Sequence, residues 1–158
     1  MTILGKKLSE YVRFQKWVLV AILAVGLVRL ALSLACAPVD TVRLFSMTAV
    51  TLAGVLYCGI AVATRGFGSY RHLLPLLALQ AVVANGIAIV GIALAGLTGR
   101  DNIFTAPEYT NLPNYWPHAL GHAAAIIIVP LVLWPVAALV LWIARRSAGS
   151  PKGVASRT

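Results

Sequence analysis

A chain of 158 residues in which 60% are hydrophobic and only 11% are charged is too apolar for a soluble globular domain, where about a quarter of the residues are charged. The charge is one-sided, with 13 Lys and Arg against 4 Asp and Glu, and the formal net charge is +9. These cations lie between or beside apolar segments and do not form the clustered basic surface that nucleic-acid binding requires. The composition therefore predicts an integral membrane protein, with the lipid bilayer as a partner and no nucleic acid.

We expect a short amphipathic helix at the start of the chain, within residues 1–16. Its apolar residues recur at helical spacing, with Lys, Glu and Arg between them: Ile3, Leu4, Leu8, Tyr11 and Val12. Helices of this kind lie in the plane of the membrane interface, with the apolar face toward the acyl region. The sequence therefore predicts a helix in the cytoplasmic headgroup layer before the first membrane span.

Four apolar stretches follow, and each is long enough to cross the membrane. About 20 residues of α-helix span the ~30 Å hydrocarbon core, and the stretches cover residues 17–36, 44–64, 73–97 and 118–143. None alternates apolar and polar residues at every second position, as the strands of a membrane β-barrel do. The pattern predicts an all-α integral membrane protein, whose four transmembrane helices form an antiparallel bundle within residues 17–144.

Basic residues at the ends of the spans predict the orientation. One side of the membrane carries most of them: Lys6, Lys7, Arg13, Lys16, Arg65, Arg71, Arg145, Arg146, Lys152 and Arg157. The loops on the other side contain only Arg43 and Arg100, together with acidic residues. By the positive-inside rule, both termini are cytoplasmic (N-in, C-in) in a bacterial-type inner membrane. Loop 98–117 is then extracytoplasmic, and the basic tail 145–158 is expected to be disordered.

The chain contains two cysteines, Cys36 and Cys58, and neither belongs to a CxxC motif. On this topology Cys36 lies at the extracytoplasmic end of the first span, and Cys58 lies nearer the cytoplasm in the second. Because the Cα atoms of a disulfide lie within ~7 Å of each other, we expect two free thiols.

Arg29 is the charged residue within the spans. At ~1.5 Å per residue it lies about 20 Å beyond Lys16, in the extracytoplasmic half of the first span. Two interpretations stay open. The side chain extends to the outer headgroups, or it faces a polar pocket, where it pairs with a carboxylate or holds an anionic group. The acidic residues on that side are Asp40, Asp101 and Glu108.

Gln80 and Asn85 are polar residues of the third span. Such side chains form hydrogen bonds between membrane helices, and they would also line a ligand cavity or a transport pathway. Small residues recur every four positions later in the same span, and they predict a helix–helix contact: Gly91, Ala95 and Gly99.

Two histidines open the fourth span, in the segment PNYWPHALGH. Pro117 suits the first turn of a helix, and residues four apart share a helix face. His118 and His122 therefore point the same way at the extracytoplasmic boundary. The loop before them supplies further polar side chains: Asp101, Glu108, Tyr109 and Tyr115.

Two imidazoles with one or two carboxylates form a ligand set suited to Zn²⁺, Cu²⁺ or Fe²⁺. The same groups could act as an acid/base pair. The pattern lacks the Glu that follows the first His in the HExxH motif of metalloproteases, and a third interpretation is that both imidazoles pin the loop by hydrogen bonds. Haem is less favoured, because two histidines on one helix cannot hold one iron from opposite sides.

Three functions remain compatible with the sequence. The polar residues gather on one side of the membrane, which favours a site that binds a metal or acts on a lipid or small molecule. An oligomeric small transporter or channel, lined by Gln80 and Asn85, is the first alternative. The second is an accessory or assembly subunit of a larger membrane complex, with the loop as a docking surface. Whether the chain is an enzyme stays open.

Overall fold

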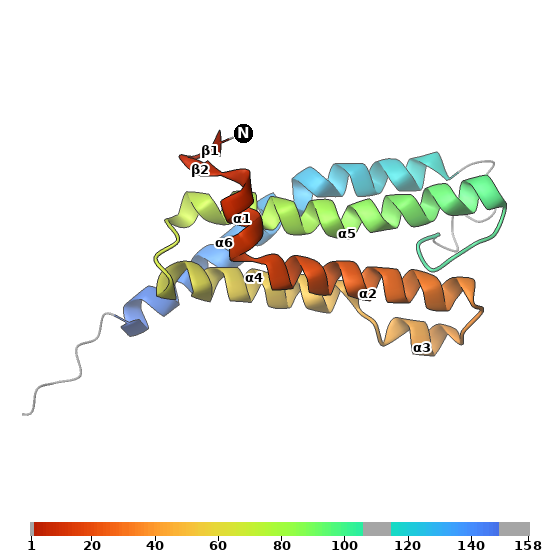
Figure 1. Cartoon of the computed structure of the whole chain (residues 1–158), viewed down its shortest axis with the longest axis horizontal. Helices are drawn as coiled ribbons and strands as arrows, with labels where there is room; N and C mark the ends of the chain where they lie inside the picture. The colour runs from red at the N-terminus through yellow and green to blue at the C-terminus, as the bar shows by residue number, and fades with distance from the viewer. Residues whose placement is uncertain (1, 106–114, 149–158) are drawn as a thin grey trace, which may run out of the picture.

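The computed structural model describes residues 2–105 and 115–148. Four long helices make up most of it (Figure 1): α2 (Lys16–Leu34), α4 (Met47–Thr64), α5 (Tyr70–Thr98) and α6 (Trp116–Ala148). These four, the second counted together with the short helix α3 (Val39–Arg43), are long and apolar enough to cross a membrane. Each overlaps one predicted span. The prediction of a mostly helical chain with four helices long and apolar enough to span a membrane is confirmed.

Different segments of the chain lie at the two ends of the helices, which we call the terminal end and the pocket end (Figure 1). The terminal end holds the N-terminal segment, the turn between α4 and α5, and the last turns of α6. The pocket end holds the connections from α2 through α3 to α4, and from α5 to α6. The N-terminal hairpin and the last described turns of α6 thus lie toward the same end of the helices (Figure 1).

The N-terminal segment is only partly the helix that was predicted. Residues 2–7 form a two-stranded hairpin, β1 (Thr2–Ile3) and β2 (Lys6–Lys7), and the helix α1 covers only Leu8–Phe14. Leu4 and Gly5 make the turn with φ values of 50° and 84°, a left-handed region that suits glycine. The prediction of helix from Ile3 was therefore wrong, because the turn at Gly5 interrupts it.

Helix α1 also buries part of the face that was expected to lie against lipid. Tyr11 is fully buried within the protein, and its hydroxyl donates a hydrogen bond of 3.0 Å to the carbonyl of Ile3. Burial, followed by the nearby Glu10 carboxylate, raises the pKa of Tyr11. Leu8 and Val12 stay exposed. The helix is therefore packed against the terminal end through Tyr11.

Two hydrophobic cores hold the helices together. The core of the terminal end joins α1, α4, α5 and α6, and it includes Val55, Leu76 and Leu141. The core of the pocket end joins α2, α4, α5 and the start of α6, and it includes Ile22, Ile92 and Ala119. Helix α6 belongs to both cores through opposite halves of its length.

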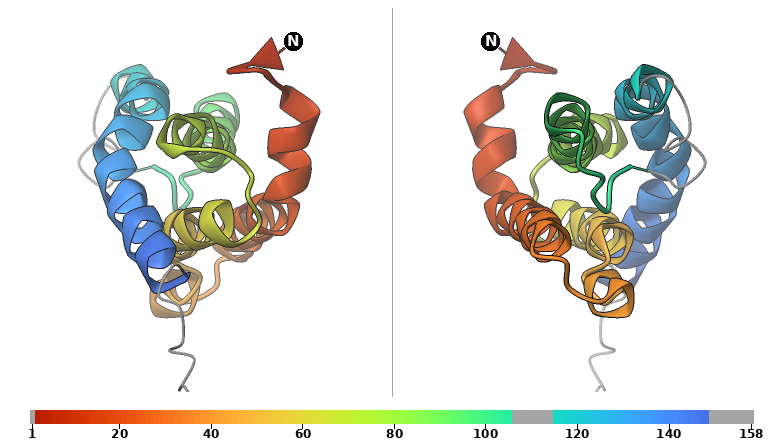
Figure 2. Two further views of the ribbon diagram at one scale, coloured as in Figure 1. Left: turned by 90° about the vertical axis from the view of Figure 1, so that its left-hand side faces the viewer. Right: turned by 90° about the vertical axis from the view of Figure 1, so that its right-hand side faces the viewer.

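Helix α6 changes its neighbour along its length. Near the terminal end it packs closely on α4 at Gly59, where a Cβ atom would lie 2.9 Å from the carbonyl oxygen of Ala137 and 2.7 Å from Val140 Cγ1. At the pocket end α6 lies beside α5 (Figures 1 and 2). Helices α4 and α6 therefore diverge from Gly59 toward the pocket end.

Candidate functional site

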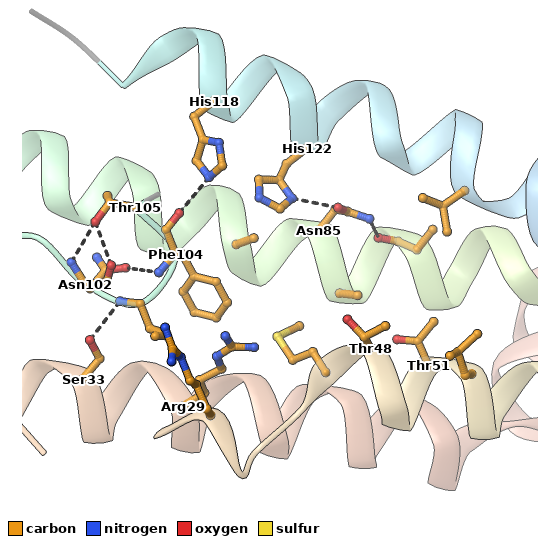
Figure 3. A pocket seen from close by; sticks show the side chains of 18 of the residues that line it. Arg29, Ser33, Thr48, Thr51, Asn85, Asn102, Phe104, Thr105, His118 and His122 are labelled. Carbon is orange, nitrogen blue, oxygen red and sulfur yellow. Dashed lines mark hydrogen bonds between the residues drawn. The ribbon is translucent and has the colours of Figure 1, made fainter. Parts of the chain in front are cut away.

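A cavity of about 1140 Å³ lies at the pocket end, lined by all four long helices and by the start of the α5–α6 connection (Figure 3). This volume is slightly above the ~300–1,000 Å³ usual for small-molecule pockets. Several of the predicted site residues line it: Arg29, Asn85, Asp101, His118 and His122. The cavity thus brings together side chains from α2, α5, α6 and the connection.

The connection after α5 turns inward, and we call residues Asp101–Thr105 the inserted turn. Figure 2 shows this segment between the helices at the pocket end. Asn102, Phe104 and Thr105 are buried. Thr105 Oγ1 accepts a hydrogen bond from the Asn102 main-chain nitrogen (3.1 Å), and Asn102 Oδ1 accepts one from the Phe104 nitrogen (3.0 Å). The turn is therefore closed by its own polar side chains.

Three helices anchor the inserted turn. Asn102 Nδ2 donates to the Gly91 carbonyl of α5 at 2.7 Å, and the Ile103 nitrogen donates to Ser33 Oγ of α2 at 2.8 Å. His118 of α6 completes the set, because its Nε2 donates to the Phe104 carbonyl at 2.9 Å (Figure 3). The contact supports the interpretation that His118 pins the loop.

His122 contacts a different partner. Asn85 Nδ2 donates to the Ala81 carbonyl at 3.0 Å, and this orients the amide so that Oδ1 faces His122. His122 Nδ1 then donates to Asn85 Oδ1 at 2.9 Å (Figure 3). The two imidazole rings lie edge to face with their centroids 5.0 Å apart. As predicted from their spacing, the two histidines share a helix face.

Arg29 points into this cavity from α2 (Figure 3). Its Nε nitrogen is buried and has no hydrogen-bond partner. The guanidinium carbon lies 5.9 Å from the centre of the Phe104 ring, a cation–π arrangement. Across residues 2–105 and 115–148, no ion pair joins Arg29 to a carboxylate. Of the two interpretations, the arrangement favours an arginine that faces a pocket.

Three other charged side chains at the pocket end each contact a residue other than Arg29: Asp40, Arg43 and Asp101. Arg43 also lines the cavity, and its Nη1 lies 3.8 Å from Asp40 Oδ1 on the exposed helix α3. Asp101 accepts a hydrogen bond of 2.8 Å from the Tyr115 hydroxyl. That hydrogen bond to the carboxylate raises the pKa of Tyr115. Neither of these contacts involves Arg29, and Glu108, the other carboxylate predicted to pair with it, lies outside the described residues.

The described residues do not assemble a metal centre. Within them, no group of three or more His, Cys, Asp or Glu side chains gathers. Glu108 and Tyr109, which were predicted to join the site, lie outside the described residues. His118 and His122 are two nitrogen ligands on one face, whereas structural and catalytic zinc sites use three or four protein ligands.

Gln80 lies apart from the cavity, in a closed cluster near the terminal end. Gln80 Nε2 donates to Gln15 Oε1 at 2.9 Å, and Gln15 Nε2 donates to the Leu76 carbonyl at 2.9 Å. The Cys58 thiol lies 3.5 Å from Gln15 Oε1 and 3.3 Å from Gln80 Nε2. All three side chains are buried. Gln80 is thus a hydrogen-bonding residue between helices, one of the two roles that were predicted.

Several side chains of the cavity and of the Gln80 cluster could not be recognised from the sequence. Gln15 was assigned to an interfacial helix, and the apolar pair Ile103 and Phe104 inside the polar loop was not noticed. That pair, flanked by Asn102 and Thr105, is a signal for a turn that buries itself. The hydroxyls of the cavity, such as that of Ser33, carry no such signal, because serine is common in membrane helices.

In comparisons with protein-family models, with curated proteins and with solved structures, nothing matches this chain.

Proposed function

We propose that this chain is a protein of a bacterial-type inner membrane and that its pocket binds an anionic group of a small molecule or lipid through Arg29. We further propose that it forms an antiparallel bundle with both termini in the cytoplasm. The basic residues of the terminal end support this orientation: Lys6, Lys7, Arg13, Lys16, Arg65, Arg71, Arg145 and Arg146. The pocket then faces the extracytoplasmic side.

The observation that carries the anion proposal is the buried and unpartnered Nε of Arg29 beside an open cavity. Arg29 as a whole is half-buried, and a charged group that is partly withdrawn from water is costly unless it finds hydrogen-bond acceptors. A guanidinium presents five donors in a planar fork that matches carboxylate and phosphate groups. An anionic ligand in the cavity would supply acceptors for this guanidinium.

The charges around the cavity support an anion in preference to a metal. Among the described residues, the charged groups that line it are Arg29, Arg43 and one carboxylate, that of Asp101, so a divalent cation would meet two guanidinium groups. A Zn²⁺, Cu²⁺ or Fe²⁺ ion at His118 and His122 stays the second version of the proposal. It requires further ligands from outside the described residues.

The transporter or channel alternative gains less support. It needs polar side chains through the whole depth, in a homo-oligomer, and Gln80 was expected to contribute to such a route. Gln80 instead bonds with Gln15 and packs beside Cys58. The accessory-subunit alternative keeps the exposed pocket-end surface as its docking face, and the partner subunit would determine its function.

The test is binding of butyl phosphate, a short water-soluble anion, to the purified protein in detergent. Loss of one charged hydrogen-bonding partner costs about 1.5–3 kcal/mol, so Arg29→Gln should weaken binding about 10-fold or more. Arg100→Gln is the matched control, since Arg100 is exposed and does not line the cavity. The proposal would be overturned if Arg29→Gln bound butyl phosphate as tightly as the unmodified protein does. It would also be overturned if the unmodified protein bound the cation butyltrimethylammonium more tightly than butyl phosphate.

A further inference from the structure

The cavity has a second, apolar part that extends away from Arg29 along α4 and α6. Four residues of α6 form one wall: Ile128, Val129, Val132 and Leu133. On α4 the wall is formed by Leu52, next to the small hydroxyl side chains of Thr48 and Thr51 (Figure 3). Three of these wall residues have a large accessible surface although they line the cavity, with exposed fractions of 45% for Leu52, 55% for Ile128 and 65% for Val132. Side chains this accessible belong to the open part of a cavity and not to an enclosed part. The cavity therefore opens sideways, between α4 and α6.

The way α6 packs on its neighbours separates α4 from α6 at this opening. Gly59 brings α4 and α6 together near the terminal end, whereas the hydrogen bond from His122 to Asn85 holds the start of α6 against α5. The gap between α4 and α6 widens between these two attachments. Pro130, which has no main-chain N–H to donate, lies in α6 next to the opening. We call this opening the α4–α6 mouth.

The α4–α6 mouth lies within the two candidate spans, so in a membrane it faces acyl chains. Water-soluble ligands reach a site through its aqueous face, but here the wall toward the membrane is apolar and open. The polar groups lie deeper and toward the pocket end, with Arg29 and Ser33 on α2 and Asn85 on α5. Polarity thus changes from charged to hydrocarbon along one continuous cavity, as it does along a lipid.

We infer that the ligand of this pocket is an anionic lipid, whose headgroup contacts Arg29 while an acyl chain leaves through the α4–α6 mouth. The inference rests on the proposed anion site and adds the class of ligand and its route of entry. Lateral entry removes the need for the lipid to cross water, because the chain stays in an apolar medium throughout. Phosphatidylcholine also carries a phosphate, but its quaternary ammonium would lie near the guanidinium groups of Arg29 and Arg43. A headgroup with a net negative charge and no ammonium is therefore favoured.

The test uses phosphatidylcholine nanodiscs that contain the protein and a trace of phosphatidic acid with a diazirine on its acyl chain. After illumination, mass spectrometry maps the cross-links. We expect cross-links concentrated on Leu52, Ile128 and Val132, and about 10-fold fewer in Arg29→Gln, in line with the loss of a charged hydrogen bond. The same diazirine on phosphatidylcholine should label the mouth weakly and without dependence on Arg29.

A second pair of variants tests the mouth itself. Val132→Trp should fill the opening and remove the phosphatidic acid cross-links, and Ile128→Trp serves if that variant does not fold. Val90→Trp is the matched control, because Val90 is 61% exposed on α5 and does not line the cavity. It should leave the cross-links unchanged.

The outcomes separate this inference from the anion proposal. If butyl phosphate binding depends on Arg29 but the lipid cross-links are spread over all lipid-facing surfaces, or ignore Val132→Trp, the lipid inference is overturned and the anion site stands. If neither probe responds to Arg29→Gln, both are overturned. If an Ile128→Cys variant in a Cys36→Ala background forms a disulfide between two chains, a second copy covers the mouth, and this would also overturn the inference.

Discussion

Gly91 shows how one residue determines the shape of the pocket end. From sequence it belongs to a row of small residues that predicts contact between helices. In the structure its neighbour is the inserted turn, since a Cβ atom at Gly91 would lie 2.6 Å from Phe104 Cδ2 and 3.3 Å from Asn102 Oδ1. Its carbonyl also accepts the hydrogen bond from Asn102. The residue is small so that the turn can reach the helix.

Gly91→Ala should therefore destabilise the protein. The added methyl group displaces the Phe104 ring, and overpacking of this kind costs about 1–3 kcal/mol of unfolding free energy. Gly86→Ala is the matched control on the same helix, because nothing lies within 4 Å of a Cβ atom there. The control should be neutral, or more stable by up to about 1 kcal/mol. Thermal unfolding in detergent measures both, and equal melting temperatures would contradict the role assigned to Gly91.

Gln15 is the second residue whose importance is visible only in three dimensions. It connects the junction of α1 and α2 to α5 through Leu76 and Gln80, and its Oε1 lies within 3.5 Å of the Cys58 thiol of α4. Gln15→Leu removes the oxygen acceptor of Gln80 Nε2 and leaves this buried amide only the weak sulfur acceptor of Cys58. An unsatisfied buried polar group costs about 1–3 kcal/mol, so we expect a lower unfolding free energy.

Thr64→Val supplies the comparison for Gln15→Leu. Thr64 is exposed, and its hydroxyl donates only to the Ile60 carbonyl of its own helix, at 3.1 Å. Its loss should change stability by less than about 0.5 kcal/mol, as is usual for surface substitutions. If Gln15→Leu were equally mild in denaturant or steric-trap unfolding, the cluster would not contribute to stability as we describe.

At the scale of elements, the helices were predictable and the connections were not. Each of the four spans follows from the length of an apolar stretch, which a single sequence shows directly. The inserted turn depends instead on contacts between distant residues, such as the hydrogen bond from Ile103 to Ser33, 70 positions away. The N-terminal hairpin was missed for a related reason, since apolar spacing at Ile3 and Leu4 fits a helix until the turn at Gly5 is considered.

The candidate site was likewise predictable only in part: the positions of its residues along the helices were, and their contacts were not. Helical periodicity was sufficient to place His118 and His122 on one face and Arg29 near the same end. Their partners, Phe104 and Asn85 for the histidines, are determined by the position of the inserted turn and by the packing of α6 on α5. Spacing along one helix carries no information about either.

The connection between α5 and α6 is tied at its two ends by the hydrogen bond from Tyr115 to Asp101. Its donor is a phenol with a raised pKa, so the bond is complete below the ordinary tyrosine pKa near 10 and is lost as the pH rises through the raised value. Asp101→Asn removes the carboxylate and should lower the pKa of Tyr115 toward its ordinary range. The difference in tyrosinate absorbance between each protein and its Tyr115→Phe variant isolates this titration. A midpoint that does not move in Asp101→Asn would contradict the assigned partner.

At the scale of the whole molecule, the two ends have opposite characters. The terminal end is closed by stacked aromatic rings and cations. The ring centroids of Phe14 and Phe67 lie 4.0 Å apart, and the Arg65 guanidinium lies 5.5 Å from the centre of the Tyr57 ring. The pocket end contains the cavity, the inserted turn and an unpartnered buried guanidinium nitrogen. Which of these ends faces the cytoplasm decides which anions and which lipid leaflet the pocket can meet.

The two native cysteines can determine that orientation. Both are free, Cys36 is exposed at the pocket end, and Cys58 is buried in the cluster with Gln15. With the pocket end extracytoplasmic, a membrane-impermeant maleimide added to spheroplasts should label Cys36. Cys58 should react only after denaturation, because its thiol is enclosed.

A cysteine at the exposed Ser147, in a Cys36→Ala background, reports on the opposite face. It should be protected in spheroplasts and react in inverted vesicles, which also shows that the reagent stays outside. If instead Cys36 were protected in spheroplasts and the cysteine at position 147 were labelled, the pocket would face the cytoplasmic side. The proposed lipid would then come from the inner leaflet, and the basic residues of the terminal end would face away from the side that the positive-inside rule assigns to them. Because Arg29 is reached through the α4–α6 mouth in either case, the labelling pattern decides the leaflet and the cross-linking decides the ligand.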